Sequence, residues 1–266
     1  MTGAEHRRVL VTGAASGLGA ALVRAFRERG DEVLATDRVA DPAVEAGIDL
    51  VLDITSDDDW SAAVDAVRER WGGLDVLVNN AGVAAGGRFE RIPIEDWDWI
   101  WEVNLKSVVR GCRTFVPLFK DQHAGHIVNV ASLAGIMNLP AMSSYNVTKA
   151  GVIALSETLR LELEPYGVHT TVVCPAFVRT NLGSRMRSPD PGVAHLMDKL
   201  MASSTVTADD VAEQVVDAVA RKRFLVLTHA DGRRSARLKR YLPRVVDGQV
   251  RTYWSRLRST VEREDS

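Results

Sequence analysis

The sequence of 266 residues has few cysteines and no long uncharged apolar run. Its two cysteines, Cys112 and Cys174, lie far apart among apolar residues, which argues against a disulfide framework and fits a reducing cytoplasm. A membrane-spanning helix is not expected, because it would need about 20 apolar residues in a row. The N-terminus lacks the apolar stretch of a signal peptide. We therefore expect a cytoplasmic protein.

The chain also lacks a marked charge of either sign. Its formal net charge is −2, which indicates no affinity for nucleic acid, and we expect no such partner. Its six histidines form no cluster with metal-ligand spacing, so we expect no metal and interpret them as ordinary surface or strand-end residues. With 46% hydrophobic and 26% charged residues, the composition is that of a globular protein.

What the sequence does contain is an alternation of short β-rich runs with longer helical patterns. Nearly all-apolar strands between helices indicate a parallel sheet that is buried on both faces. The pattern predicts an α/β fold with a doubly wound parallel sheet (Rossmann fold), as a single domain with ligands at the carboxyl ends of the strands. The predicted strands are 9–12, 32–36, 50–52, 75–78, 126–130, 168–173 and 224–227, and the main helices 19–29, 56–67, 95–119, 144–166 and 209–220.

Three parts of the chain are expected to differ in role. Residues 1–228 form the predicted dinucleotide-binding and catalytic domain, in which the Gly-, Ser- and Pro-containing segment of about 179–204 is the predicted substrate lid. Residues 229–266 form a basic extension with interspersed apolar residues, typical of an amphipathic helix pair. Such a pair can touch a membrane surface, cover the active site, reach a neighbouring subunit or pack on its own subunit. The sequence leaves all four open.

A glycine-rich turn, Thr12–Gly19, joins the first predicted strand to the first helix. Its glycines let a pyrophosphate approach the helix N-terminus, where free N–H groups and the helix dipole favour an anion. A plain tight turn is the alternative. Asp37 ends the second strand, where a carboxylate accepts ribose hydroxyls and repels a 2′-phosphate. Arg38 follows and can hold such a phosphate, so the pair favours NAD but leaves NADP open.

A second group of polar residues indicates proton transfer. Tyr145 and Lys149 are four apart in a predicted helix and so share a face, although a surface pair is the alternative. We expect the ammonium and an oxidised nicotinamide to lower the phenol pKa from about 10, which suits it to exchange a proton with an alcohol. Ser132 ends the fifth strand and can hold a substrate oxygen. Asn104, among apolar neighbours, indicates either a kink or an ordered water linked to Lys149.

Taken together, these motifs resemble the short-chain dehydrogenase/reductase family over about residues 9–227. The matching segments include TGAASGLG at Thr12–Gly19 and NNAG at Asn79–Gly82, in the family's order and separations. The resemblance implies an NAD(P)-dependent oxidoreductase with a catalytic tetrad of Asn104, Ser132, Tyr145 and Lys149. With the residues argued above, it implies these coenzyme-binding residues: Gly13, Ser16, Gly17, Leu18, Gly19, Asp37, Arg38, Asp53, Ile54, Asn80, Ala81, Gly82, Tyr145, Lys149, Pro175, Val178 and Thr180.

The sequence departs from the family pattern after the sixth strand. The family usually has Pro-Gly there, whereas this chain has Pro175 followed by Ala176. A Cβ at Ala176 restricts the backbone that passes the nicotinamide. The spacing of Val178 and Thr180 is retained, so we expect a subfamily variation with Thr180 at the carboxamide.

The predicted function is hydride transfer between NAD and a secondary alcohol or ketone, with Tyr145 as acid/base. An NADP-dependent carbonyl reductase and a catalytically silent NAD-binding sensor are the alternatives. Apolar candidates for the substrate pocket favour a lipid-, steroid- or terpenoid-like substrate, although packing of the lid on the core explains them equally well. These candidates are Ala84, Leu133, Ile136, Leu139, Met142, Phe177, Met186 and Met197.

The resemblance also implies a homodimer or homotetramer built on helix 95–119 and on the helix that carries Tyr145. Trp97, Trp99 and Trp101 alternate within the first of these helices. Because they lie on a helix, they cannot share one face.

Overall fold

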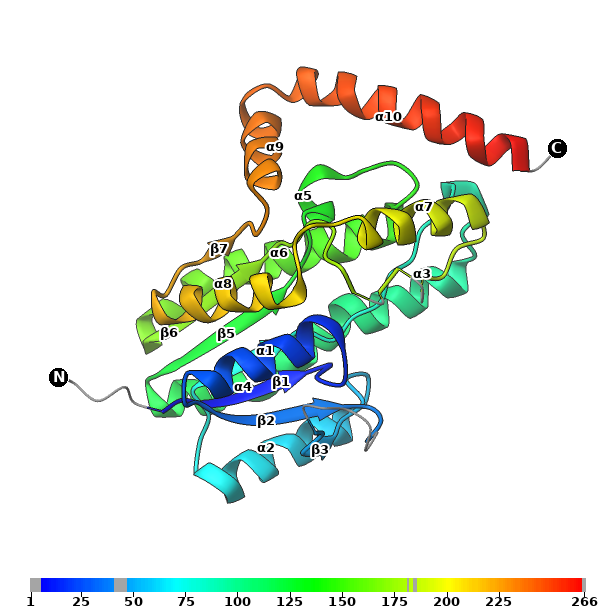
Figure 1. The fold of residues 1–266 in the computed structure, drawn as a ribbon. Helices are drawn as coiled ribbons and strands as arrows, with labels where there is room; N and C mark the ends of the chain where they lie inside the picture. Colours follow the sequence, from blue (N-terminus) through cyan, green and yellow to red (C-terminus); the bar gives the residue numbers. More distant parts are fainter. Residues whose placement is uncertain (1–5, 41–46, 181, 184–185, 265–266) are drawn as a thin grey trace.

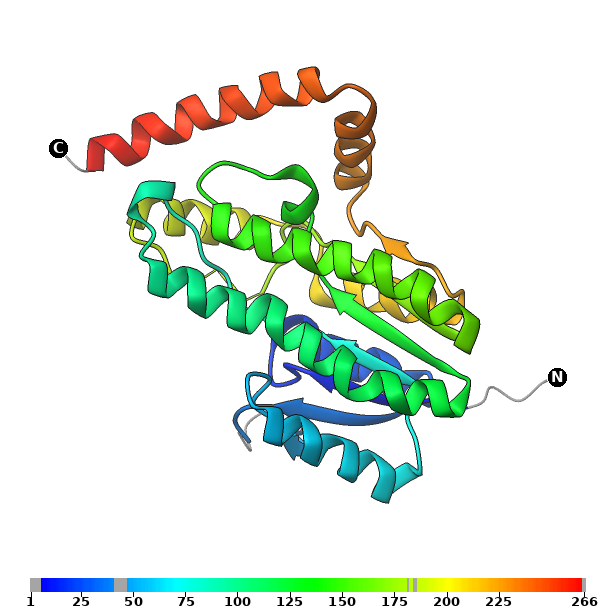
Figure 2. The same cartoon turned by 180° about the vertical axis from the view of Figure 1, so that it is seen from behind.

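The computed structural model describes residues 6–40, 47–180, 182–183 and 186–264. The predicted domain 1–228, lid 179–204 and extension 229–266 each include positions outside these ranges: 1–5 and 41–46, 181 and 184–185, and 265–266. In the described part, seven parallel strands form one sheet in the order β3-β2-β1-β4-β5-β6-β7, with helices on both faces (Figures 1 and 2). The predicted doubly wound α/β fold is confirmed.

The strands are β1 (Arg8–Thr12), β2 (Glu32–Asp37), β3 (Leu50–Val51), β4 (Val76–Asn79), β5 (Gly125–Val130), β6 (Val168–Val173) and β7 (Leu225–Val226). The helices are α1 (Gly17–Glu28), α2 (Asp57–Trp71), α3 (Ile94–Trp101), α4 (Ser107–Gln122), α5 (Ala134–Met137), α6 (Ser143–Leu163), α7 (Pro191–Ala202), α8 (Ala208–Ala220), α9 (Ala230–Tyr241) and α10 (Pro243–Glu264). Short helical turns, Phe89–Arg91 and Glu164–Tyr166, precede α3 and follow α6.

The core consists of two apolar layers, one on each face of the sheet. On β1, Val9 and Val11 point into the layer with α1 and α8, whereas Leu10 points into the layer with α2, α4 and α6. Successive residues of a strand face opposite sides of the sheet. Because helices cover both sides, all three side chains are fully buried. The sheet order reverses between β1 and β4, so the loops after these strands turn to opposite faces and leave a crevice at their carboxyl ends.

The predicted helix 95–119 is interrupted at its centre. A π-helical turn, Glu102–Lys106, separates α3 from α4 and carries Asn104, which is fully buried. A π turn holds an extra residue and so breaks the regular hydrogen-bond pattern of the helix. Of the two interpretations of Asn104, the structural one thus corresponds to a π turn at this position.

The tryptophans of α3 point in different directions, as predicted. Trp97 meets the Phe89 ring edge-on at 6.1 Å between centroids. Trp99 carries the Arg187 guanidinium over its ring at 3.8 Å. Trp101 leaves 46% of its surface exposed.

The two C-terminal helices lie outside the layers of the sheet domain (Figure 1). The Lys239 ammonium on α9 donates to the carbonyls of Ile136 and Met137 at 2.6 and 3.0 Å, which fixes α9 to α5. Helix α10 runs along α7 and buries Leu257 and Val261. The predicted helix pair thus forms and packs on its own subunit.

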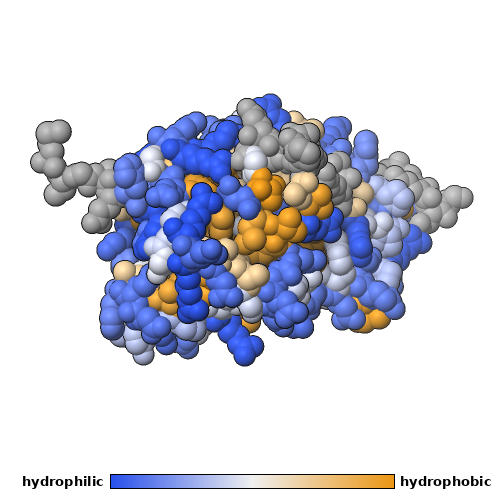
Figure 3. All heavy atoms as spheres, turned by 90° about the horizontal axis from the view of Figure 1, so that it is seen from below, coloured by the Kyte–Doolittle hydropathy of each residue, from blue (hydrophilic) through white to orange (hydrophobic). Residues whose placement is uncertain are grey.

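The outer surface is mainly polar. Seen from below, the sheet domain presents a largely hydrophilic face with an apolar patch near its middle (Figure 3). Within the described ranges, no helix has the length and apolar character needed to cross a membrane.

Candidate active site

The turn between β1 and α1 needs glycine at several positions for steric reasons. Gly13 and Gly17 have φ angles of 69° and 54°, the left-handed region that favours glycine. A Cβ on Gly13 would lie 2.8 Å from the Cα of Ala81. A Cβ on Gly19 would overlap the Gly13 carbonyl. Gly13 and Gly19 therefore allow the turn to pack closely against itself and against the loop after β4, which a side chain at either position would prevent.

The turn is tied to the carboxyl end of β4 by hydrogen bonds. The Thr12 hydroxyl accepts from the backbone N–H groups of Asn80 and Ala81 at 3.0 and 3.1 Å. The Asn80 side-chain amide donates to the carbonyls of Thr12 and Gly13 at 2.9 and 3.3 Å. The predicted coenzyme residues of these two loops thus lie together, on either side of the reversal in sheet order. Asn80 braces the turn with its side chain.

Acidic groups follow β2 and β3 at the same edge. The Asp37 carboxylate accepts from the N–H groups of Ala15 and Arg38 at 3.0 and 2.8 Å, so it faces the glycine turn. Asp53 accepts from the backbone and hydroxyl of Thr55, and these hydrogen bonds lower the pKa of its carboxyl. The Ile54 carbonyl accepts from the Trp60 indole at 3.0 Å. Asp37 thus joins the turn directly, whereas Asp53 and Ile54 form local contacts at the start of α2.

Ser132, Tyr145 and Lys149 share one buried site at the carboxyl end of β5. The Ser132 hydroxyl donates to the Pro175 carbonyl at 3.4 Å and lies close enough to the Tyr145 phenol to lower its pKa. The same hydroxyl accepts from Ala134 N–H at 3.1 Å, which holds it at the start of α5. The Lys149 ammonium donates to the Val130 carbonyl at 3.0 Å and lies 5.8 Å from the centre of the Tyr145 ring. The three side chains predicted to act together are therefore neighbours.

The electrostatics of this site differ from the prediction in one respect. Burial raises the pKa of the Tyr145 phenol, and the nearby Ser132 hydroxyl lowers it by less. Burial also lowers the pKa of Lys149 to about 8. The expectation that the ammonium lowers the phenol pKa therefore does not hold for the protein alone, because the cost of desolvating a phenolate is larger. At neutral pH the phenol is protonated.

Asn104 bridges the π turn and the loop after β4. Its side chain accepts from Val83 N–H at 2.8 Å and donates to the Val83 carbonyl at 2.9 Å. A Cβ on Gly82 would lie 3.1 Å from the Asn104 Oδ1 and 3.5 Å from the Lys149 Nζ. Asn104, Gly82 and Lys149 are therefore in close proximity. The water that we expected between Asn104 and Lys149 stays a prediction.

The loop after β6 closes the other side of the site. The Pro175 carbonyl accepts from Leu133 N–H at 2.8 Å, so the loop runs beside Ser132. A Cβ on Gly17 would lie 3.4 Å from Thr180, which places Thr180 over the glycine turn. Val178 is buried in the same layer as α1. Pro175, Val178 and Thr180 thus line the space between the glycine turn and Ser132.

His229 supports this loop and was missed as a site residue by the sequence analysis. Its Nε2 lies 2.9 Å from the Phe177 carbonyl, and its Nδ1 accepts from Ala176 N–H at 3.3 Å. The Thr228 hydroxyl is 2.7 Å from the same Nδ1. These contacts require a neutral ring with its proton on Nε2. The ring holds the Pro175-Ala176 segment at which the sequence departs from the family pattern, and that departure was the available signal.

The apolar candidates separate into two groups. Met142, Phe177, Met186 and Met197 belong to one apolar cluster with Tyr145. In contrast, Ile136 packs into the layer under α4 and α6, and Leu133 lies 3.2 Å from a Cβ built on Gly232 of α9. The cluster around Tyr145 also includes residues that sequence reasoning missed, on α7 and α10: Val193, Leu257, Val261, Tyr253 and Trp254.

A buried carboxylate fixes the start of α7 over this cluster. Asp190 is 1% exposed and accepts from the Arg88 backbone at 2.6 Å. It also accepts from the guanidinium groups of Arg88 and Arg91 at 2.7 and 3.1 Å. The arginine hydrogen bonds hold the pKa of its carboxyl below the usual value. Part of the predicted lid is thus clamped to the loop after β4.

The chain is similar to known proteins along most of its length. The family described as short chain dehydrogenase matches residues 7–191. A probable oxidoreductase, EphD, of Mycobacterium tuberculosis is 36% identical over 234 residues, which cover 81% of this chain but 40% of that protein. The chain thus spans less than half of the length of this relative.

Two further proteins match nearly end to end. The 2-(R)-hydroxypropyl-CoM dehydrogenase of Xanthobacter autotrophicus is 34% identical over 228 residues, 80% of this chain and 89% of that protein. A solved short chain dehydrogenase/reductase from Burkholderia phymatum in complex with NAD has a TM-score of 0.82 and 31% identity, and covers 90% of this chain and 95% of its own.

Proposed function

Because this chain belongs to the short-chain dehydrogenase/reductase family of NAD(P)-dependent oxidoreductases, we propose that it transfers a hydride between NAD and a secondary alcohol or ketone. The observation that carries the proposal is the burial of Ser132, Tyr145 and Lys149 at the carboxyl end of β5, where the Lys149 ammonium lies 5.8 Å from the centre of the Tyr145 ring. A coenzyme-binding module without chemistry would not require this arrangement. Bound NAD supplies the hydride acceptor, and NADH the donor in the reverse direction.

The side chains of the site supply the proton. In reduction, the protonated phenol of Tyr145 donates its proton to the ketone oxygen, and in oxidation its phenolate takes the hydroxyl proton of the alcohol. Ser132 holds the substrate oxygen beside the phenol. Lys149 binds the nicotinamide ribose through its ammonium. Asn104 holds the π turn against the Val83 backbone through two hydrogen bonds and so fixes the loop after β4 beside the site.

The preference for NAD rests on Asp37. Its carboxylate faces the glycine turn through Ala15, where the adenosine ribose would bind, and it would repel a 2′-phosphate. The turn fits such a coenzyme because its left-handed glycines, Gly13 and Gly17, lead tightly into the N-terminus of α1, where free N–H groups favour the pyrophosphate. Dissociation constants for NAD and NADP measure the preference. Tighter binding of NADP would assign Arg38 the dominant role and contradict the proposal.

The proposed substrate is hydrophobic and enters under α7. The cluster around Tyr145 is apolar, with Met142 and Met197 as adaptable side chains. The part of the predicted lid that the structure describes includes α7, held at Asp190. We assign it the role of covering the substrate.

The proposed assembly is a homodimer or homotetramer through α4 and α6. These helices leave apolar side chains exposed, among them Val109, Val147 and Leu161. Light scattering after size exclusion measures the assembly, and a monomer at micromolar concentration would contradict it. Both cysteines, Cys112 and Cys174, are free and buried, which agrees with the proposed cytoplasmic setting.

Replacement of the phenol tests the reaction. In Tyr145→Phe we expect kcat/KM for hydrophobic secondary alcohols to fall by roughly 10²–10⁴-fold, because the proton-transfer group is removed. The dissociation constant of NAD should stay within about twofold. The matched control is Tyr166→Phe, at an exposed tyrosine, which should retain activity. Wild-type protein that binds NAD but reduces it with no alcohol of a broad panel would favour the NAD-binding sensor.

A further inference from the structure

The corner between α9 and α10 exposes apolar side chains to solvent. All residues from 240 to 245 are exposed, and Tyr241, Leu242 and Val245 leave 73%, 54% and 49% of their surfaces accessible. The corner projects at the top of the view in Figure 1, away from the sheet. Apolar side chains gathered at a projecting point indicate an interaction surface.

Arginines surround these apolar side chains. Residues 230–245 contain six basic residues and a single acidic residue, Asp231. Lys239 points inward to α5. The other five are exposed, and within the described ranges no ion pair joins them to a carboxylate: Arg233, Arg234, Arg237, Arg240 and Arg244. The corner thus has a local positive charge that the near-zero net charge of the whole chain conceals.

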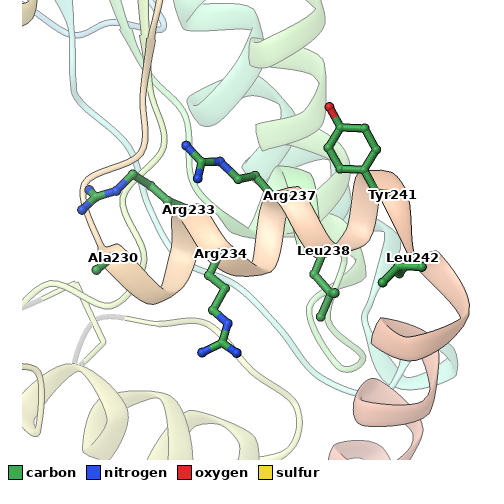
Figure 4. Close-up of a pocket in the computed structure, with 7 residues that line it drawn as sticks. All are labelled: Ala230, Arg233, Arg234, Arg237, Leu238, Tyr241 and Leu242. Atoms are coloured by element: carbon green, nitrogen blue, oxygen red, sulfur yellow. The ribbon is translucent and has the colours of Figure 1, made fainter.

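Arginines and apolar side chains lie next to each other along α9 and at Leu242, which follows it. Figure 4 shows Arg237 beside Tyr241 on one side of the helix, and Arg234 in line with Leu238 and Leu242 on another. Together they line a shallow surface hollow of 430 Å³. A cationic rim with apolar tips is the arrangement of a surface that enters the interface of an anionic membrane.

We propose that this corner docks the protein on the surface of an anionic lipid bilayer. The guanidinium groups bind lipid phosphates, and the side chains of Tyr241, Leu242 and Val245 enter the boundary between headgroups and acyl chains. Nucleic acid would satisfy the arginines but would leave the leucine and valine exposed. A symmetric contact with a second copy would place two sets of five arginines against each other, which charge repulsion opposes.

The attachment of the corner to the body supports this role. Lys239 fixes α9 to the carbonyls of α5, and Gly232 packs under Leu133. On α10, Val246 is 2% exposed, so the corner has its own buried anchor. The docking surface is therefore presented by packed helices in a fixed orientation.

Vesicle cosedimentation of the full chain tests the proposal. We expect binding to vesicles of phosphatidylglycerol and phosphatidylcholine, weak binding to phosphatidylcholine alone, and loss of binding at high salt. Substitution of Arg234, Arg237 and Arg240 by Gln should weaken binding on the order of a hundredfold, about fivefold for each arginine. The double variant Leu242→Gln with Val245→Gln should weaken it roughly tenfold, because the apolar insertion is lost.

The matched control removes the same charge from the opposite end of the molecule. The exposed Arg29 follows α1, and the exposed Arg68 and Arg70 lie on α2; both helices lie far from the corner in Figure 1. Substitution of the three by Gln should leave vesicle binding within twofold. Equal losses in both triple variants, or equal binding to both kinds of vesicle, would overturn the proposal. So would retention by a DNA duplex but not by vesicles, or self-association that disappears with the corner arginines. Unchanged thermal midpoints show that each variant folds.

Discussion

The glycine turn after β1 and the corner between α9 and α10 use backbone and side chains in opposite ways. At the turn, carbonyls and amides pair with β4 and the place of a Cβ on Gly19 is filled by the Gly13 carbonyl. At the corner, side chains project into solvent, and a Cβ on Gly248 of α10 would meet nothing within 4 Å. The first region is shaped by close backbone packing, and the second presents charge and apolar surface.

The largest contrast is expected when one methyl group is added to the turn. Gly19→Ala should weaken NAD binding by about a hundredfold or more, equivalent to ~3 kcal/mol. Its Cβ would collide with the Gly13 carbonyl and so distort the turn at the proposed pyrophosphate site. Titration calorimetry with NAD measures the change. An unchanged dissociation constant in a folded variant would show that the coenzyme does not use this turn.

A buried ion pair at the start of α7 and an exposed pair on α10 should differ in the same sense. Asp190→Asn removes the buried negative charge that pairs with Arg88 and Arg91 and should lower the free energy of unfolding by about 3 kcal/mol. Glu262→Gln on α10 removes the exposed pair with Arg258 and should cost about 0.5 kcal/mol or less. Urea unfolding measures both. Similar losses would mean that the clamp at α7 is solvated in solution.

The buried Lys149 should give a pH-dependent stability that the exposed arginines do not. Its folded-state pKa of about 8 lies below the ordinary 10.5, so the unfolded chain binds more protons between these values. Stability therefore rises with pH in this window, by about 2 kcal/mol from pH 8 to 10 relative to Lys149→Met. Parallel pH profiles of wild type and variant would contradict the burial of this ammonium.

The smallest effect is expected in the open region. Gly248→Ala places a methyl group in unoccupied space within a helix and should raise the free energy of unfolding by about 0.5–1 kcal/mol. Destabilisation in thermal unfolding would indicate that the chain approaches Gly248 more closely than this structure shows.

Local patterns were enough to predict most of the sheet domain. The apolar strands, the cap of α2 at Ser56 and the stop at Gly167, with φ of 69°, follow from residue types alone. The neighbourhood of Ser132, Tyr145 and Lys149 also followed, because ends of parallel strands meet at one edge of a sheet. At Asn104 the sequence indicated a kink as one alternative, but not the extra residue of a π turn. The turn depends on the two hydrogen bonds between the Asn104 side-chain amide and the Val83 backbone.

What the sequence did not predict depends on contacts between distant segments. His229 binds Phe177 and Ala176 across more than 50 residues, and no periodic pattern encodes that contact. The placement of α10 against α7 follows from the fit of Leu257 and Val261 into the cluster around Tyr145. The direction of the Tyr145 pKa shift depends on the burial of the phenol, which raises the pKa, whereas sequence reasoning considered only the two positive charges, the neighbouring ammonium and an oxidised nicotinamide.

The hydrogen bonds of His229 have a consequence for any shortened form of this protein. A chain cut before residue 229 would lose two helices and also the acceptor of the Ala176 N–H, whereas the Phe177 carbonyl would keep the Ser204 hydroxyl as a donor. An unsatisfied polar group inside a protein costs about 1–3 kcal/mol. Such a truncation would therefore loosen the loop that lines the proposed nicotinamide pocket, and a loss of turnover in it would say nothing about membrane attachment.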